Sequence, residues 1–92
     1  MPDNADPPAD AYGQTRRCLE IIVAALAEAG AGAEHVIRTR TFLLDAGDWE
    51  EVGRAHGEVF ADVRPASTMI VVSALLDPRW IVEIEADALL PE

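Results

Sequence analysis

The stretch Arg64–Leu90 reads RPASTMIVVSALLDPRWIVEIEADALL, and its residue pattern decides the fold. It contains two strand-like runs, Ser67–Leu75 and Trp80–Ala88. In the second run, apolar residues recur at every second position: Trp80, Val82, Ile84, Ala86 and Ala88. The opposite face of this run is mostly acidic. A period of two with one apolar face is typical of a half-buried strand.

The two runs are predicted to pair as a hairpin through the turn Leu76–Arg79. Pro78 has no N–H to donate, so the first strand must end before it. The first run is apolar on both faces at Met69–Val72, which predicts a position deeper in the sheet. An isolated hairpin is at best marginally stable. We therefore expect helices on one face of the sheet and partner chains on the other.

The length and net charge of the chain limit its domain count and the classes of partner that it could bind. A chain of 92 residues predicts one domain, and a hydrophobic content of 50% is enough for a core. The net charge is −10, with seven arginines and no lysine, which argues against nucleic acid and against anionic membranes. Neither a signal peptide nor an apolar run of membrane-spanning length is visible, so a cytoplasmic protein is expected.

The chain before the hairpin begins with Met1–Asp10, which is rich in Pro and Asp and is predicted to be a disordered acidic tail ahead of a domain at 11–92. A helix is predicted over Ala11–Ala29, capped by Asp10 and ended by Gly30. Its apolar stripe is Leu19, Ile22, Val23 and Leu26.

A strand follows at His35–Leu44. Alternation predicts one face with Val36, Arg38, Arg40 and Phe42, and another with Ile37, Thr39, Thr41 and Leu43. Asp48 and Glu51 are predicted to form a capping box for a second helix. The inward stripe of this helix is Trp49, Val52, His56, Val59 and Phe60. The predicted element order is α-β-α-β-β.

Candidate site residues are few. Arg38 and Arg40 are placed to hold a carboxylate ligand, although pairing with Glu83 and Glu85 across the sheet is the favoured interpretation. These two glutamates are accordingly interpreted as solvated or paired, and not as glycosidase carboxylates.

Cysteine and histidine offer no further site. Cys18 and His56 are interpreted as packed residues, because each lies among apolar neighbours without a reactive partner. His35 is the other histidine, so no metal-ligand spacing exists and no metal is expected.

Three segments together resemble one known family, the Rid proteins, also described as reactive-intermediate deaminases or endoribonuclease L-PSP-like proteins. They are QTRRCLEIIVAALAEAGA (Gln14–Ala31), VIRTRTFLLDAGDWEEVGRAHGEVFADVRPAST (Val36–Thr68) and VEIEADA (Val82–Ala88). The resemblance implies a chorismate-mutase-like α+β fold with two helices on one face of the sheet. It also implies a homotrimer with ligand clefts between subunits.

The resemblance further implies hydrolysis of enamines and imines to 2-keto acids and ammonia without a cofactor. In active members an arginine after Pro-Ala binds the substrate carboxylate, and a glutamate of the last strand, here Glu83, helps to place the water. This chain has Ser67 at the arginine position, and a serine cannot form the two-pronged ion pair. Arg64, three residues earlier, is a poor substitute.

The expected activity is therefore weak or absent, with a small carboxylate or imine ligand bound at a subunit interface by Ser67, Arg64, Arg38 or Arg40. An active deaminase in which Arg38 or Arg40 binds the carboxylate is a second hypothesis. A third is a non-catalytic module that assembles with a full-length paralogue. The family's N-terminal strands are expected to be missing here. Ribonuclease activity is disfavoured by the acidic charge and by the absence of a His–His or His–Lys pair.

Overall fold

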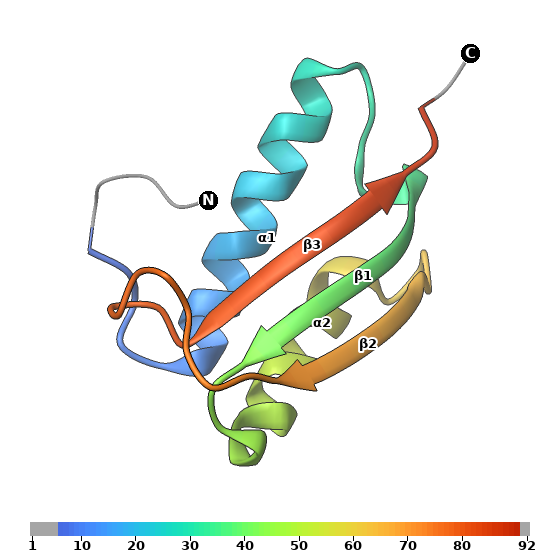
Figure 1. Cartoon of the computed structure of the whole chain (residues 1–92). Coiled ribbons are helices and arrows are strands. Elements are labelled where there is room, and N and C mark those ends of the chain that lie inside the picture. Colours follow the sequence, from blue (N-terminus) through green and yellow to red (C-terminus); the bar gives the residue numbers. More distant parts are fainter. Residues whose placement is uncertain (1–5, 91–92) are drawn as a thin grey trace.

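The computed structural model describes residues 6–90, and their elements follow the predicted order (Figure 1). They are α1 (Ala11–Glu28), β1 (Val36–Leu43), α2 (Trp49–Phe60), β2 (Ala66–Val71) and β3 (Val82–Ala88), with 3-10 turns at Ala33–His35 and Ala46–Asp48. Both helices cover the same face of a three-stranded sheet. The predicted α+β architecture is confirmed.

Strand β1 is the centre of the sheet, whose order is β2-β1-β3. It pairs parallel with β2 and antiparallel with β3, so the predicted hairpin between the two C-terminal runs is wrong. Residues 72–81 form a loop across the end of β1 instead of a tight turn (Figure 1). The Val72 N–H donates to the Leu43 carbonyl at 2.8 Å, and the Leu44 N–H donates to the Ile81 carbonyl at 3.3 Å.

Strand β2 lies at an edge of the sheet and is exposed along its whole length. Met69, Ile70 and Val71 keep 39%, 37% and 55% of their surfaces exposed, so the predicted deep position of this run is wrong for the single chain. An apolar pattern indicates that side chains avoid water, but it does not say which chain covers them.

A register irregularity between Val36 and Arg38 changes which side chains of β1 face the helices. Val36 was predicted to share a face with Arg38, but it is buried in the core, whereas Ile37 is exposed. A bulge adds one residue to a strand and so exchanges the faces of the residues before it. After the bulge the predicted alternation holds, with Thr39, Thr41 and Leu43 buried.

Helix α1 begins and ends at the predicted signals. The Asp10 carboxylate accepts a hydrogen bond from the Gly13 N–H at 2.8 Å. At the other end Gly30 has a φ of 82°, which a residue with a side chain rarely adopts. The Ala31 N–H donates to the Leu26 carbonyl at 2.8 Å, as in a Schellman motif.

Helix α2 departs from its prediction at the first turn. Asp48 makes no side-chain cap, and the predicted capping box with Glu51 is absent. The preceding 3-10 turn runs directly into the helix, so the Asp45 carboxylate caps that turn instead, through the Gly47 N–H at 2.8 Å. Trp49 was predicted to face inward, but it is 58% exposed. The helix buries Val52, Ala55 and Phe60.

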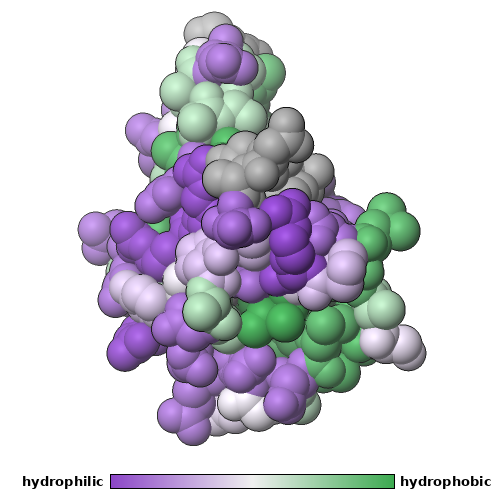
Figure 2. Space-filling view, turned by 90° about the vertical axis from the view of Figure 1, so that its left-hand side faces the viewer, coloured by the Kyte–Doolittle hydropathy of each residue, from purple (hydrophilic) through white to green (hydrophobic). Residues whose placement is uncertain are grey.

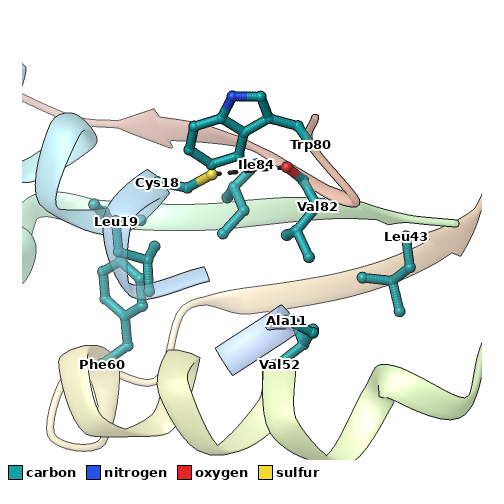
Figure 3. Close-up of a cluster of buried hydrophobic side chains, with 10 residues drawn as sticks. Ala11, Cys18, Leu19, Leu43, Val52, Phe60, Trp80, Val82 and Ile84 are labelled. Atoms are coloured by element: carbon teal, nitrogen blue, oxygen red, sulfur yellow. Dashed lines mark hydrogen bonds between the residues drawn. The ribbon is translucent and has the colours of Figure 1, made fainter. Parts of the chain in front are cut away.

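The core lies between the helices and the inner face of the sheet (Figure 3). Phe60 points from α2 into this cluster, and Cys18 lies against β3, where its thiol is 3.8 Å from the Val82 carbonyl oxygen. Among the residues of β3 that were predicted to face inward, Val82 and Ile84 are buried, and Ala86 and Ala88 are half-buried and pack against the core.

Gln14, which is buried, ties the loop before β3 to α1. Its amide donates to the carbonyls of Pro8 and Arg79, and its oxygen accepts from the Ile81 N–H at 2.7 Å. Arg79 also pairs with Asp6 at 3.1 Å. Positions 1–5 of the predicted disordered tail lie outside the described residues, and its disorder in solution stays a prediction.

Candidate functional site

Arg40 lies on the helix-free face of the sheet and is held by two carboxylates. Its Nε donates to Glu85 at 3.0 Å and its Nη1 donates to Asp87 at 3.4 Å. The hydrogen bond that Arg40 donates to Glu85, with the charge of Asp87, raises the pKa of the Arg40 guanidinium. Cross-strand pairing was the favoured interpretation of this residue, and it is confirmed for Glu85, with Asp87 in addition.

Glu83 lies on the same helix-free side, opposite Phe42 of β1. The residue is half-buried, and within residues 6–90 its carboxylate makes no hydrogen bond or ion pair. Arg38 is paired in register with Asp87 and is exposed. The predicted Arg–Glu83 pair is therefore not formed, and this carboxylate is available to a ligand or to another chain.

Ser67 faces the opposite way, toward α2. In register it stands beside Thr39, whose Oγ1 donates to the Ser67 Oγ at 3.3 Å. The same Thr39 oxygen is 2.8 Å from the Nε2 of His56. We call Ser67, Thr39 and His56 the hydroxyl–imidazole cluster. Sequence reasoning chose only Ser67 as a site residue, because His56 was interpreted as a packed side chain and Thr39 was assigned only to a face of its strand.

His56 is a half-buried residue of α2 that contacts Thr39 of β1 and Phe60 of its own helix. Its ring lies 4.8 Å from the Phe60 ring, at a tilted angle of 48°. Burial lowers the pKa of His56, because an imidazolium loses hydration in this position. The histidine is thus packed, as predicted, but it is also hydrogen-bonded to a residue that contacts Ser67.

Arg64 is set apart from the other candidates. It lies four residues after the end of α2 and has a φ of 54°, and its N–H donates to the Phe60 carbonyl at 2.9 Å. The residue is exposed, and no side-chain contact with the other predicted site residues is formed within the described chain.

Ser67 and Glu83 cannot meet within one chain. They lie on outer strands separated by β1 and face opposite sides of the sheet. Ser67 is level with Thr39, whereas Glu83 is level with Phe42. From the usual spacing of strands and rise per residue, their backbones are about 14 Å apart.

Comparison with known proteins identifies the family. The sequence model described as Endoribonuclease L-PSP matches residues 2–90. The chain belongs to this family. The resemblance to Rid proteins is thereby confirmed. RutC family proteins are among the relatives, including one from Haemophilus influenzae that is 35% identical over 75 residues, 82% of this chain and 65% of that protein.

Two further relatives and a solved structure agree with this assignment. An uncharacterized protein of Streptomyces coelicolor is 46% identical over 79 residues, covering 86% of this chain and 59% of its own length. The 3-aminoacrylate deaminase RutC of Acinetobacter baylyi is 34% identical and also covers 86% of this chain, with 62% of its own. The crystal structure of Rv2704 from Mycobacterium tuberculosis, a member of the YjgF/YER057c/UK114 family, has a TM-score of 0.88 and 43% identity, over 90% of this chain and 70% of that one.

The chain spans about 60% of the length of curated relatives such as the Streptomyces coelicolor protein. The similarity to the solved structure from Mycobacterium tuberculosis confirms the fold.

The surface of this L-PSP family member carries exposed apolar residues. In Figure 2 hydrophobic side chains gather along one side of an otherwise mostly hydrophilic surface. Exposed large apolar residues in the described chain include Ile37, Trp49, Met69, Ile70, Val71 and Leu76. An open groove between the helices has a volume of about 380 Å³ and contains no predicted site residue; it is lined by Arg16, Leu19, Glu20, Val23, Ala24, Ala27 and Val59.

Within 6–90, no group of three or more His, Cys, Asp or Glu side chains is arranged to hold a metal ion. No helix of the described chain has the length and apolar character needed to cross a membrane.

Replacing Thr41 with Val is expected to raise the free energy of unfolding by about 1 kcal/mol. The Thr41 hydroxyl is buried and has no hydrogen-bond partner in the described part of the chain, and such a group is destabilising. Thr39→Val is the matched control two residues away, and it should lower stability by about 1–2 kcal/mol because a paired hydroxyl is lost. Urea unfolding measures both. Equal destabilisation by the two variants would contradict this account of the strand.

Proposed function

We propose that this protein carries the enamine- and imine-hydrolysing chemistry of its family in a weakened form, at a site between subunits. The observation that carries the proposal is the position of Ser67. Within residues 6–90 its hydroxyl is hydrogen-bonded to Thr39 and to no guanidinium, and Arg40 lies on the other face with Glu85 and Asp87. The substrate carboxylate would therefore lack a charged partner.

The proposed site is completed by a second copy of the chain, in a homotrimer. Two observations support this arrangement. Ser67 and Glu83 face opposite sides of one sheet, so a ligand that contacts both residues needs two chains. Apolar side chains of β2 are also exposed, and large exposed apolar surfaces are typical of association sites.

The proposed reaction joins water to a C=N bond and releases ammonia. The Glu83 carboxylate orients the water and accepts one of its protons as the oxygen bonds to carbon. The nitrogen receives protons and leaves as ammonia when the carbonyl forms. Glu83 suits this role because its carboxylate is half-buried and makes no ion pair in the described chain. No cofactor is required by this scheme.

Ser67→Arg is expected to raise the rate of ammonia release from 2-aminoacrylate at least about 30-fold. The guanidinium would restore a charge-assisted pair with the substrate carboxylate, which is worth roughly 2–5 kcal/mol when buried. The substrate is generated in the assay by a pyridoxal-phosphate-dependent dehydratase. Ser67→Lys is the matched control, and it should gain less because an ammonium is not a planar fork.

The outcome separates the proposed activity from its alternatives. A wild-type protein as fast as Ser67→Arg would mean that Ser67 does not limit the reaction. If both stay at the buffer rate, the non-catalytic module is favoured. The free edges of β2 and β3 in the described sheet suit such an assembly. Native mass spectrometry with a full-length paralogue would then detect mixed oligomers. The expected cytoplasmic location stays a prediction.

A further inference from the structure

The hydroxyl–imidazole cluster joins a buried group to an exposed one. Thr39 is fully buried, yet its hydroxyl has two partners, the Ser67 Oγ at 3.3 Å and the His56 Nε2 at 2.8 Å. Ser67 is exposed on the edge strand β2. The buried threonine and the half-buried histidine therefore fix the orientation of a serine hydroxyl that solvent or a ligand can reach.

Within residues 6–90, no charged side chain is hydrogen-bonded to the cluster. On β1, the nearest charged residues, Arg38 and Arg40, alternate to the helix-free face. Strand β2 has no ionisable residue between Ala66 and Val71. On α2, Arg54 lies over the Tyr12 ring at 4.3 Å, and Glu58 accepts from Tyr12 and pairs with Arg16, toward α1.

We propose that this cluster is a neutral substrate-binding subsite, in which Ser67 binds an uncharged carbonyl, amide or imine group. Thr39 and His56 are its positioning residues. The inference rests on the proposed function and names its substrate class: imines whose group at Ser67 carries no charge. A carboxylate at this position would lose hydration and meet only a hydroxyl, which is unfavourable without a cation.

The chain of hydrogen bonds allows Ser67 to bind either a neutral acceptor or a neutral donor. When His56 carries its proton on Nε2, it donates to Thr39, Thr39 donates to Ser67, and Ser67 donates to a carbonyl or imine acceptor. In the other tautomer the direction is reversed, and Ser67 accepts from an amide N–H. Burial, which lowers the pKa of His56, favours the neutral ring at neutral pH in both cases.

The test compares pyruvamide with pyruvate, two probes of the same size that differ in charge. In amide NMR titrations, pyruvamide should shift the Ser67 and Thr39 signals and bind at least about tenfold more tightly than pyruvate, as expected for loss of an unpaired-charge penalty. Ser67→Arg should reverse that preference. Equal or tighter binding of pyruvate by the wild-type protein, or no shift of these signals by pyruvamide, would overturn the proposal.

Variants of Thr39 and His56 distinguish a role in positioning Ser67 from a role in folding stability. Thr39→Val should weaken pyruvamide binding severalfold, whereas Thr41→Val, the same change two residues along β1, should leave it unchanged. His56→Gln keeps a polar group for Thr39 and should bind better than His56→Phe. If all four variants bind alike, Thr39 and His56 do not position Ser67.

Ammonia release from 2-aminoacrylate distinguishes this proposal from the one on which it rests. Rapid wild-type release together with a preference for pyruvate would overturn the neutral subsite and leave the hydrolytic function intact. Selective pyruvamide binding, with no ammonia released from 2-aminoacrylate or from the imine of pyruvamide, would support the subsite and overturn the function.

Discussion

Phe60→Ala is expected to lower the free energy of unfolding by about 3–5 kcal/mol, the usual range for removing a fully buried aromatic side chain. Phe60 is 2% exposed and is among the largest fully packed side chains of the core. It projects from α2 into the cluster that joins both helices to the sheet (Figure 3). The substitution therefore leaves a cavity in the core between the two helices and the sheet.

Trp49→Ala is the control for this experiment, because it removes a larger aromatic side chain from the same helix. Trp49 is 58% exposed, so its loss should lower stability by less than about 1 kcal/mol. Urea or guanidinium unfolding, at equal protein concentration, gives both values. If Trp49→Ala is the more damaging change, the predicted inward orientation of Trp49 describes the protein in solution better than the structure does.

Cys18 is expected to react with a thiol reagent about a thousandfold more slowly in the native protein than in the unfolded chain at neutral pH. Its side chain is fully buried between α1 and β3. Burial raises the pKa of the Cys18 thiol to about 12, with the charge of Glu83 adding to the effect. The reactive thiolate is therefore scarce, and the reagent cannot reach it.

The reaction is followed by thiol labelling in buffer and in concentrated guanidinium, with Cys18→Ala as the blank. Native labelling as fast as that of a free thiol would show that the core around Cys18 opens readily. The raised pKa of Cys18 also predicts how stability changes at alkaline pH. The folded protein keeps the thiol proton when the unfolded chain has lost it, so stability falls as pH rises from about 9 toward 12. Cys18→Ala should lack this part of the loss.

Local patterns in the sequence predicted most of the elements. The two-residue period of β3 gave its buried face, and Asp10 and Gly30 gave the ends of α1. These signals concern neighbouring residues, whose geometry depends little on the rest of the chain. At α2 the same kind of signal failed, because the 3-10 turn before it already held Asp48 in place.

The pairing of strands could not be predicted in the same way. Two apolar runs close in sequence suggested a hairpin, but β1 pairs with both and separates them. Helix α2 lies between β1 and β2 in the sequence and connects them as parallel neighbours, so the pairing joins segments that are far apart along the chain. The bulge near Arg38, which exposes Ile37, likewise depends on the paired strand.

The candidate site was predicted in outline through the family resemblance, which pointed to Ser67 and Glu83. The hydrogen bonds that join Ser67 to Thr39 and Thr39 to His56 were missed, although Thr39 and His56 were on faces that the sequence described. Finding it needed the parallel register of β1 and β2, which places Thr39 beside Ser67. No short-range spacing carries that information.

The central claim, that Ser67 and Glu83 of different copies form one site, is tested most directly by mixing two deficient chains. One carries Ser67→Arg with Glu83→Gln, and the other is the wild-type protein, which keeps Glu83 but lacks the arginine. After joint unfolding and refolding, we predict ammonia release from 2-aminoacrylate at about a quarter of the rate of the single Ser67→Arg protein, because about that share of sites in a randomly mixed ring combines Arg and Glu. A mixture no faster than the average of its two components would contradict the claim.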